Sequence, residues 1–104
     1  MQTLIPTDGI LEQAELQVRP GQESDFEQAF KQAETIICNM PGYLGHQLLR
    51  CMEKNNQYLL LVRWQTLADH IEGFRQSPQY QQWRELLHHF YDPFPEVWHY
   101  QSVE

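Results

Sequence analysis

Residues 64–78 read Trp-Gln-Thr-Leu-Ala-Asp-His-Ile-Glu-Gly-Phe-Arg-Gln-Ser-Pro, and in this stretch a strand gives way to a helix. The apolar residues Leu67, Ile71 and Phe74 recur at helical spacing, and His70 falls on the same apolar stripe. Thr66 is of a residue type that caps the first turn of a helix. A histidine in this position is either a hydrogen-bonded core residue or the polar group of a pocket, and the sequence leaves both interpretations open.

The sequence before this stretch predicts a strand, a helix and a hairpin. Residues 10–19 alternate apolar and polar side chains, which is typical of a strand with one apolar face. A Pro-Gly pair and acidic residues follow, and apolar residues then recur at helical spacing to about residue 39. Residues 43–52 and 58–64 have strand composition and a polar connection between them, which predicts a hairpin. The second of these strands is apolar on both sides except at Arg63, as in a central strand covered on both faces.

The sequence after residue 76 predicts a second helix and a last strand. Ser77 can cap this helix, and Pro78 suits its first turn because the missing N–H has no intrahelical partner there. Two prolines in residues 91–95 end the helix, and residues 96–103 have the β-branched and aromatic content of a strand. The apolar stripe of the helix consists of Tyr80, Trp83, Leu87 and Phe90.

The predicted order of elements is therefore β-α-β-β-α-α-β, the split βαβ arrangement of ferredoxin-like α+β folds. We expect a four-stranded antiparallel sheet with the helices on one face, formed by a single domain over residues 10–104 after a flexible N-terminal arm of residues 1–9. The other face of this sheet would expose apolar residues. Because such patches usually mark an interface, the sequence predicts a homodimer.

Composition excludes several classes of function. The chain has 104 residues, a net charge of −7 and only seven Lys and Arg residues, which argues against nucleic-acid binding. The longest apolar run, residues 59–62, is too short to cross a membrane. Cys38 and Cys51 form no disulfide framework, and we expect reduced thiols in a cytoplasmic protein. No motif of His, Cys or acidic residues predicts a metal site, and no bound cofactor is expected.

The order of these elements, together with three pieces of sequence, resembles the antibiotic biosynthesis monooxygenase (ABM) family of the dimeric α+β barrel superfamily. The pieces are Val-Arg-Pro-Gly at 18–21, Pro-Gly-Tyr-Leu-Gly at 41–45 and the stretch at 64–78, and the resemblance covers residues 10–103. It implies a homodimer whose sheets pack face to face, with a pocket between sheet and helices in each subunit. It does not imply one reaction, because the superfamily includes cofactor-independent oxygenases of polycyclic phenols, haem-degrading oxygenases and proteins without known activity.

The haem-degrading branch uses an Asn on the first strand, a Trp on the helix after the third strand and a His iron ligand on the next helix. The first strand here contains no Asn, and Gly73 or Phe74 stands at the place of the Trp. Trp83 or Arg84 stands at the place of the ligand, although the pair His88 and His89 lies one turn further on. The haem pattern is thus missing at each expected place, and haem binding stays a second alternative.

Two hypotheses for function follow. The first is a cofactor-independent monooxygenase of a small aromatic or quinol-type compound, in which His70 acts as the base that ionises a phenol for direct reaction with oxygen. The second is a non-catalytic ligand-binding or structural homodimer, in which the same residues pack as core. In the first, an aromatic wall would hold a flat ligand. The residues of this wall are Trp64, Phe74, Tyr80 and Trp83.

Overall fold

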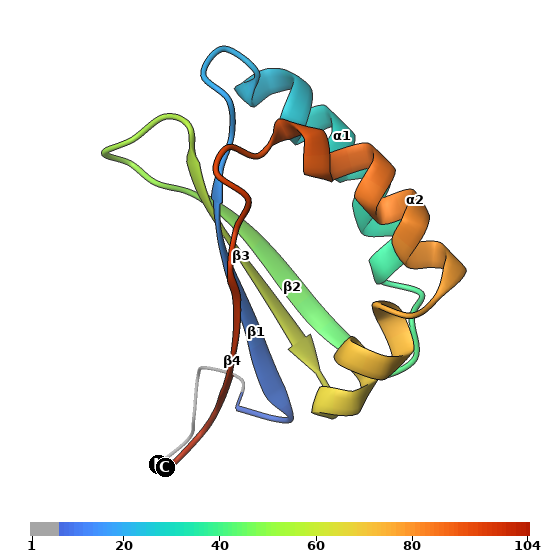
Figure 1. Cartoon of the computed structure of the whole chain (residues 1–104). Helices are drawn as coiled ribbons and strands as arrows, with labels where there is room; N and C mark the ends of the chain where they lie inside the picture. Colours follow the sequence, from blue (N-terminus) through green and yellow to red (C-terminus); the bar gives the residue numbers. More distant parts are fainter. Residues whose placement is uncertain (1–6) are drawn as a thin grey trace.

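The sheet has the strand order β2-β3-β1-β4, and both long helices lie on one of its faces (Figure 1). This arrangement, seen in a computed structural model that describes residues 7–104, confirms the predicted ferredoxin-like α+β fold. Residues 1–6 of the predicted arm lie outside the described residues, so the division at residue 9 stays a prediction. In chain order the elements are β1 (Ile10–Gln17), α1 (Glu23–Ile37), β2 (Tyr43–Arg50), β3 (Gln57–Trp64), η1 (Asp69–Phe74), α2 (Pro78–Leu87), η2 (His88–Phe90) and β4 (Val97–Gln101).

The core lies between the helices and the inward face of the sheet. Every second residue of β3 is buried beneath the helices, from Tyr58 to Trp64. α1 contributes the apolar stripe that its sequence predicts, including Phe26 and Phe30. Phe26 packs against Tyr58 with ring centroids 4.9 Å apart. Aromatic contacts of this kind fix α1 against β2 and β3 and leave α2 to cover the other half of the sheet.

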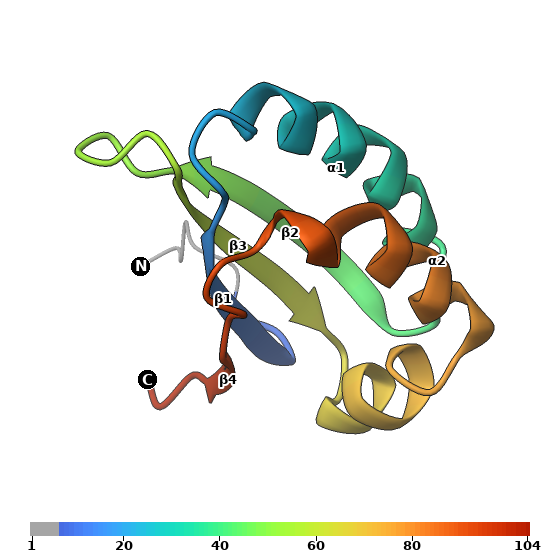
Figure 2. The same ribbon diagram turned by 45° about the horizontal axis from the view of Figure 1, so that its top comes forward.

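The opposite face of the sheet carries no helix within residues 7–104 (Figures 1 and 2). β3 is a central strand as predicted, but within the described residues one chain covers only its inward face: its outward residues, Leu59 and Leu61 among them, are only partly buried, so the predicted cover of the second face stays a prediction. Trp98 and Tyr100 of β4 are exposed. We call this surface of Leu59, Leu61, Trp98 and Tyr100 the open sheet face.

The segment that carries His70 forms a wider helical turn than predicted. η1 is π-helical, and the N–H of Arg75 donates to the carbonyl of His70 at 3.0 Å. In a π-helix, residues four apart align more closely than in an α-helix, so His70 and Phe74 are the two buried residues of this turn. Leu67 is 44% exposed, and the expectation that it packs on the apolar stripe is wrong because the stripe was drawn for α-helical spacing.

Both predicted helix caps are present. Thr66 Oγ1 accepts from the N–H of Asp69 at 3.1 Å, and Asp69 Oδ2 accepts in return from the N–H of Thr66 at 3.1 Å. Ser77 accepts from the N–H of Tyr80 at 3.2 Å. These hydrogen bonds fix the residues at which the helical turns before and after the His70 segment begin. They thereby fix where His70 lies against the sheet.

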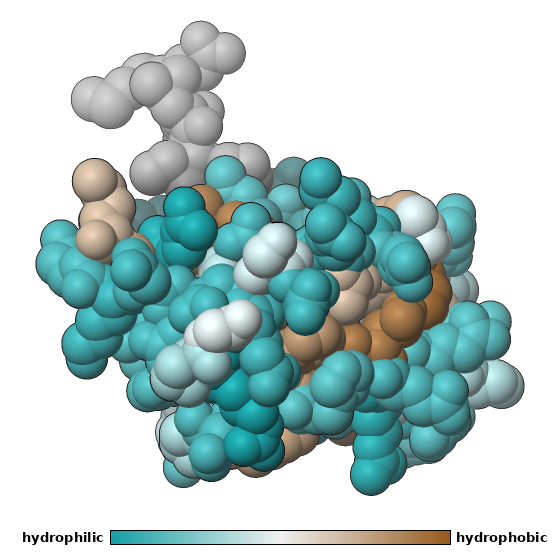
Figure 3. Space-filling view, turned by 90° about the horizontal axis from the view of Figure 1, so that it is seen from above, coloured by the Kyte–Doolittle hydropathy of each residue, from teal (hydrophilic) through white to brown (hydrophobic). Residues whose placement is uncertain are grey.

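Viewed from above in Figure 3, the surface is mostly hydrophilic, and hydrophobic residues form a band between polar ones. None of the helices in the described part of the chain is both long and apolar enough to cross a membrane.

Candidate functional site

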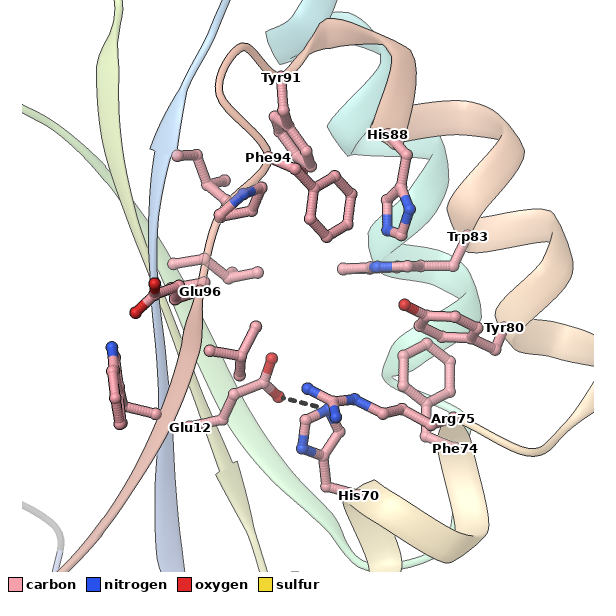
Figure 4. Close-up of a pocket in the computed structure, with 16 residues that line it drawn as sticks. Glu12, His70, Phe74, Arg75, Tyr80, Trp83, His88, Tyr91, Phe94 and Glu96 are labelled. Carbon is pink, nitrogen blue, oxygen red and sulfur yellow. Dashed lines mark ion pairs between the residues drawn. The ribbon is translucent and has the colours of Figure 1, made fainter.

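A cavity of about 680 Å³ lies between the sheet and α2 (Figure 4). Side chains of β1 and β4 form one wall, and η1 and α2 form the opposite wall. The segment 91–96 closes one end. A volume of this order is that of a typical small-molecule site.

Aromatic contacts join η1, α2 and α1 along one wall of the cavity. The ring of Phe74 packs edge-on against the rings of Tyr80 and Trp83, with centroid distances of 5.2 Å and 5.6 Å. Trp83 in turn contacts Phe30 of α1 at 5.8 Å. Because α2 is fixed through these rings to η1 and α1, space remains between it and β1. The aromatic residues line the cavity, and they leave room for a ligand beside His70.

Glu12 of β1 is the buried acidic group of this cavity. Its side chain is on the inward face of the sheet and is 7% exposed. Its Oε1 accepts from Trp64 Nε1 at 2.8 Å and lies 3.2 Å from His70 Nε2. Burial raises the pKa of this carboxyl to about 7, although the Trp64 N–H and the charge of Arg75 both favour the ionised form. Near neutral pH, Glu12 can therefore both accept and release a proton.

His70 connects Glu12 to a second histidine. Its ring is 2% exposed and stacks on Trp64 with centroids 5.3 Å apart and planes at 16°. Nδ1 lies 2.8 Å from Nε2 of His99 on β4. Burial, together with smaller contributions from the charges of Arg75 and His99, lowers the pKa of His70 to about 3.

The protonation of this pair follows from those shifts. His70 is neutral at physiological pH, so its 3.2 Å contact with Glu12 is not an ion pair of two full charges. The neutral ring can carry its hydrogen on either nitrogen, and Nε2 is the nitrogen that lies on the side of the Glu12 carboxylate. Nδ1 is hydrogen-bonded to His99, so the three side chains form a row of close polar contacts that runs from the cavity to β4.

Four of the five residues selected from the sequence border this cavity: His70, Phe74, Tyr80 and Trp83. Trp64 does not. It is fully buried behind His70, where it supports the ring and donates to Glu12. The alternative in which His70 bonds a backbone carbonyl does not fit the structure, because both ring nitrogens meet side chains.

Sequence reasoning missed Glu12, His99 and Arg75. The signal for Glu12 was present, because it has the same parity as Ile10 and Ala14 and so interrupts the apolar face of the first strand. His99 and Arg75 carry no comparable local signal. The pairing of β4 with β1 places His99 opposite Glu12 and against His70, and the turn at the end of η1 brings Arg75 to the cavity.

The remaining histidines occupy separate places. His88 borders the cavity, and burial lowers its pKa, with a further contribution from the charge of Arg84. His89 is exposed. His46 of β2 lies between Tyr43 and Glu34, where its Nε2 is 3.1 Å from the Glu34 carboxylate. Within residues 7–104, no three His, Cys, Asp or Glu side chains gather as they would around a metal ion.

The sequence profile of the family described as antibiotic biosynthesis monooxygenase matches residues 9–86. The chain belongs to this family. Solved structures of ABM proteins align with most of this chain. A protein from Bordetella bronchiseptica assigned to the antibiotic biosynthesis monooxygenases has 38% identity, a TM-score of 0.86, and an alignment over 91% of this chain and 97% of its own.

Two further proteins are similar to this chain, one in sequence and one in fold. YczJ of Bacillus subtilis (strain 168), an uncharacterized protein, is 54% identical over 94 residues, which are 90% of this chain and 99% of YczJ. SnoaB of Streptomyces nogalater, a cofactor-independent oxygenase, has a TM-score of 0.80 at 19% identity, over 91% of this chain and 93% of SnoaB. At that identity, the likeness to SnoaB shows the ABM fold alone.

Proposed function

We propose that the cavity binds a small aromatic phenol or quinol and that the protein oxidises it with molecular oxygen and no bound cofactor. The observation that carries this proposal is the buried pair of Glu12 and His70 on the floor of an aromatic-walled cavity. Flat ligands stack on such walls. Membership of the ABM family and the activity named for SnoaB support the same class of reaction.

Glu12 replaces His70 as the proposed base. A general base works best when its pKa is close to the working pH, and the pKa of Glu12 is about 7 whereas that of His70 is about 3. His70 lies 3.2 Å from the carboxyl and is itself held by its hydrogen bond to His99. We assign His70 a positioning role rather than the catalytic one expected from the sequence.

The reaction balances without an external reductant. Glu12 takes the proton of the substrate O–H, and the resulting phenolate carries its electron density onto a ring carbon. Oxygen accepts electrons from that carbon and forms a C–O bond to it as a peroxide. Cleavage of the O–O bond with loss of the ring C–H proton leaves a quinone carbonyl and releases water, so that 1-naphthol and O₂ would give 1,4-naphthoquinone and H₂O.

The experiment compares aerobic and anaerobic incubation of the protein with 1-naphthol and related naphthohydroquinones. We expect oxygen uptake with 1-naphthol and one ¹⁸O atom in the quinone formed under ¹⁸O₂, with turnover at least about 100-fold lower in Glu12→Gln. Lack of oxygen-dependent turnover for every compound, with tight binding retained, would favour the non-catalytic ligand-binding alternative. A shift of the Soret band on addition of haem would favour the haem alternative.

We also propose that the open sheet face packs against that of a second copy. Its exposed aromatic and leucine side chains are the apolar patch predicted from the sequence. Burying them would complete the cover of β3 that one chain lacks. Cys38 and Cys51 are free thiols, which favours a cytoplasmic location for this dimer.

A further inference from the structure

Arg75 is a charged residue of the cavity without a partner in the described part of the chain. It lies directly after η1, is partly buried, and lines the cavity together with Glu12 and His70. Within residues 7–104, its guanidinium makes no hydrogen bond or ion pair, whereas Arg19 and Arg50 each pair with a carboxylate. A guanidinium offers five donors in a fixed planar arrangement, and those of Arg75 are available to a ligand in the cavity.

The guanidinium and the Glu12 carboxyl face the same point. Figure 4 shows the Arg75 head beside Glu12 and above His70, directed into the cavity rather than out of it. The positive charge of Arg75 lowers the pKa of Glu12, of His70 and of His99, which places it within electrostatic reach of all three. A ligand oxygen at this point would meet a proton acceptor and a fixed cation together.

We infer that the ligand carries an acidic hydroxyl, phenolic or enolic, and is bound as its oxyanion against Arg75 after Glu12 has taken the proton. The O–H bond breaks, the proton passes to the Glu12 carboxylate, and the negative charge moves from the carboxylate to the ligand oxygen. The net charge of the site is unchanged by the transfer, and the anion that remains is the ligand oxygen, which can pair with Arg75. A permanent carboxylate fits less well, because it brings a second negative charge and no proton to Glu12.

Other titratable groups surround this point and set the working pH range. At pH values between the pKa of Glu12 and the pKa of the free phenol, the proton moves from the ligand to Glu12 on binding. At pH values below the pKa of Glu12, the carboxyl is already protonated and cannot take the proton. The groups that face the ligand oxygen and its surroundings are His70 of η1, Tyr80 of α2, His88 of η2, Tyr91 and Glu96 of the closing segment, and His99 of β4.

This inference rests on the proposed function for its ligand class, but binding alone tests it. The probes are 3-nitrophenol, its methyl ether 3-nitroanisole, and 3-nitrobenzoate. 3-Nitrophenol is mainly neutral in solution at pH 7, and its phenolate is yellow. With the unmodified protein at pH 7, we expect 3-nitrophenol to bind with the absorbance of the phenolate and more tightly than either of the other two probes.

Two variants and a control separate charge from packing. Arg75→Gln should weaken binding of 3-nitrophenol about 10- to 100-fold and leave binding of 3-nitroanisole unchanged within about twofold. In Glu12→Gln the proton of 3-nitrophenol can go only to solvent, so the phenolate absorbance of the bound probe should depend on pH between 6 and 8 in a way that differs from the unmodified protein, where Glu12 takes the proton. Arg84→Gln removes an exposed arginine of α2 that does not line the cavity, and it should alter none of these measurements.

The outcomes distinguish this inference from the proposed reaction. If Arg75→Gln weakened the binding of 3-nitrophenol and of 3-nitroanisole equally, Arg75 would be a packing residue and the inference would be overturned. Three other results would also overturn it: binding of 3-nitrophenol in its neutral form, tighter binding of 3-nitrobenzoate than of 3-nitrophenol, or no binding of any probe. Phenolate binding that depends on Arg75 in a protein without oxygen-dependent turnover would support the inference and defeat the monooxygenase.

Discussion

At the scale of single residues, the cost of burying Glu12 is the feature with the clearest consequences. The carboxyl has a pKa of about 7 in the folded protein and 4.5 as its ordinary value. Between those values, the folded state holds a proton that the unfolded state has released, so stability falls as pH rises. Above pH 7 the full penalty applies, on the order of 3 kcal/mol.

We therefore predict that Glu12→Gln stabilises the protein in a pH-dependent way. Gln keeps the acceptor for Trp64 and removes the group that must ionise. The variant's free energy of unfolding should exceed that of the unmodified protein by an amount that grows by about 2 kcal/mol between pH 5 and pH 8. The reason is that Glu12 must lose its proton over this range, whereas the Gln side chain has none to lose. Urea denaturation at both pH values measures it. An advantage that does not change with pH would mean that the carboxyl is not held neutral by burial.

Trp64 acts on the same carboxyl through one hydrogen bond. Its Nε1–H donates to Oε1 and favours the ionised form. Trp64→Phe keeps an aromatic ring behind His70 and removes this donor. We predict that the pKa of Glu12 rises above 7 in this variant, as measured by the carboxyl ¹³C chemical shift during an NMR titration. A pKa that stays at its original value would show that the indole only packs.

At the scale of the elements, the position of η1 depends on Gly42 in the turn before β2. Gly42 has φ +82°, and a Cβ there would lie 2.2 Å from Cγ of Asp69. Asp69 is the residue that closes the cap with Thr66. The glycine thus allows the turn before β2 to lie against the start of η1, which holds His70 in place.

Gly42→Ala should lower the free energy of unfolding by more than Gly21→Ala, by at least about 1 kcal/mol. Gly21 is the matched control, since it has φ +88° but no atom within 4 Å of an added Cβ, so alanine there meets backbone strain alone. Chemical denaturation of both variants gives the comparison. Equal losses would show that the contact with Asp69 relaxes without cost, and the role of Gly42 in holding η1 would be wrong.

At the scale of the whole molecule, the two faces of one sheet have different roles. The inward face and α2 enclose the cavity, whereas the open sheet face presents apolar groups that no helix covers in residues 7–104. A dimer formed through the open sheet face would leave the cavity of each subunit on the far side of its sheet. Function and assembly would then be separable by mutation.

Leu61→Asp tests this arrangement. Leu61 lies on the outward side of the central strand β3, and a charge there should convert a dimer of about twice 12.5 kDa into monomers. Sedimentation or light scattering measures the mass. The control is Met52→Asp, because Met52 is 92% exposed in the loop between β2 and β3 and outside the strands. A monomeric unmodified protein, or a dimer that survives Leu61→Asp, would contradict the predicted interface.

Much of the fold could be predicted from local patterns. The alternation in β1, the apolar stripe of α1 and the cap formed by Ser77 each depend on residues close in the chain, and each is present as predicted. The π-helical form of η1 could not be predicted in this way, because α-helical and π-helical turns share most of their apolar positions and differ in which residue faces the core.

The sequence by itself determined the order of elements, the ferredoxin-like sheet and the presence of aromatic residues and a histidine near one end of it, because periodicity and caps are local properties. Only the tertiary structure decided which group we propose as the base. Glu12, His70 and His99 come from three segments that meet through strand pairing and helix packing. Their proton affinities depend on burial and on neighbouring charge, which exist only once those segments have met.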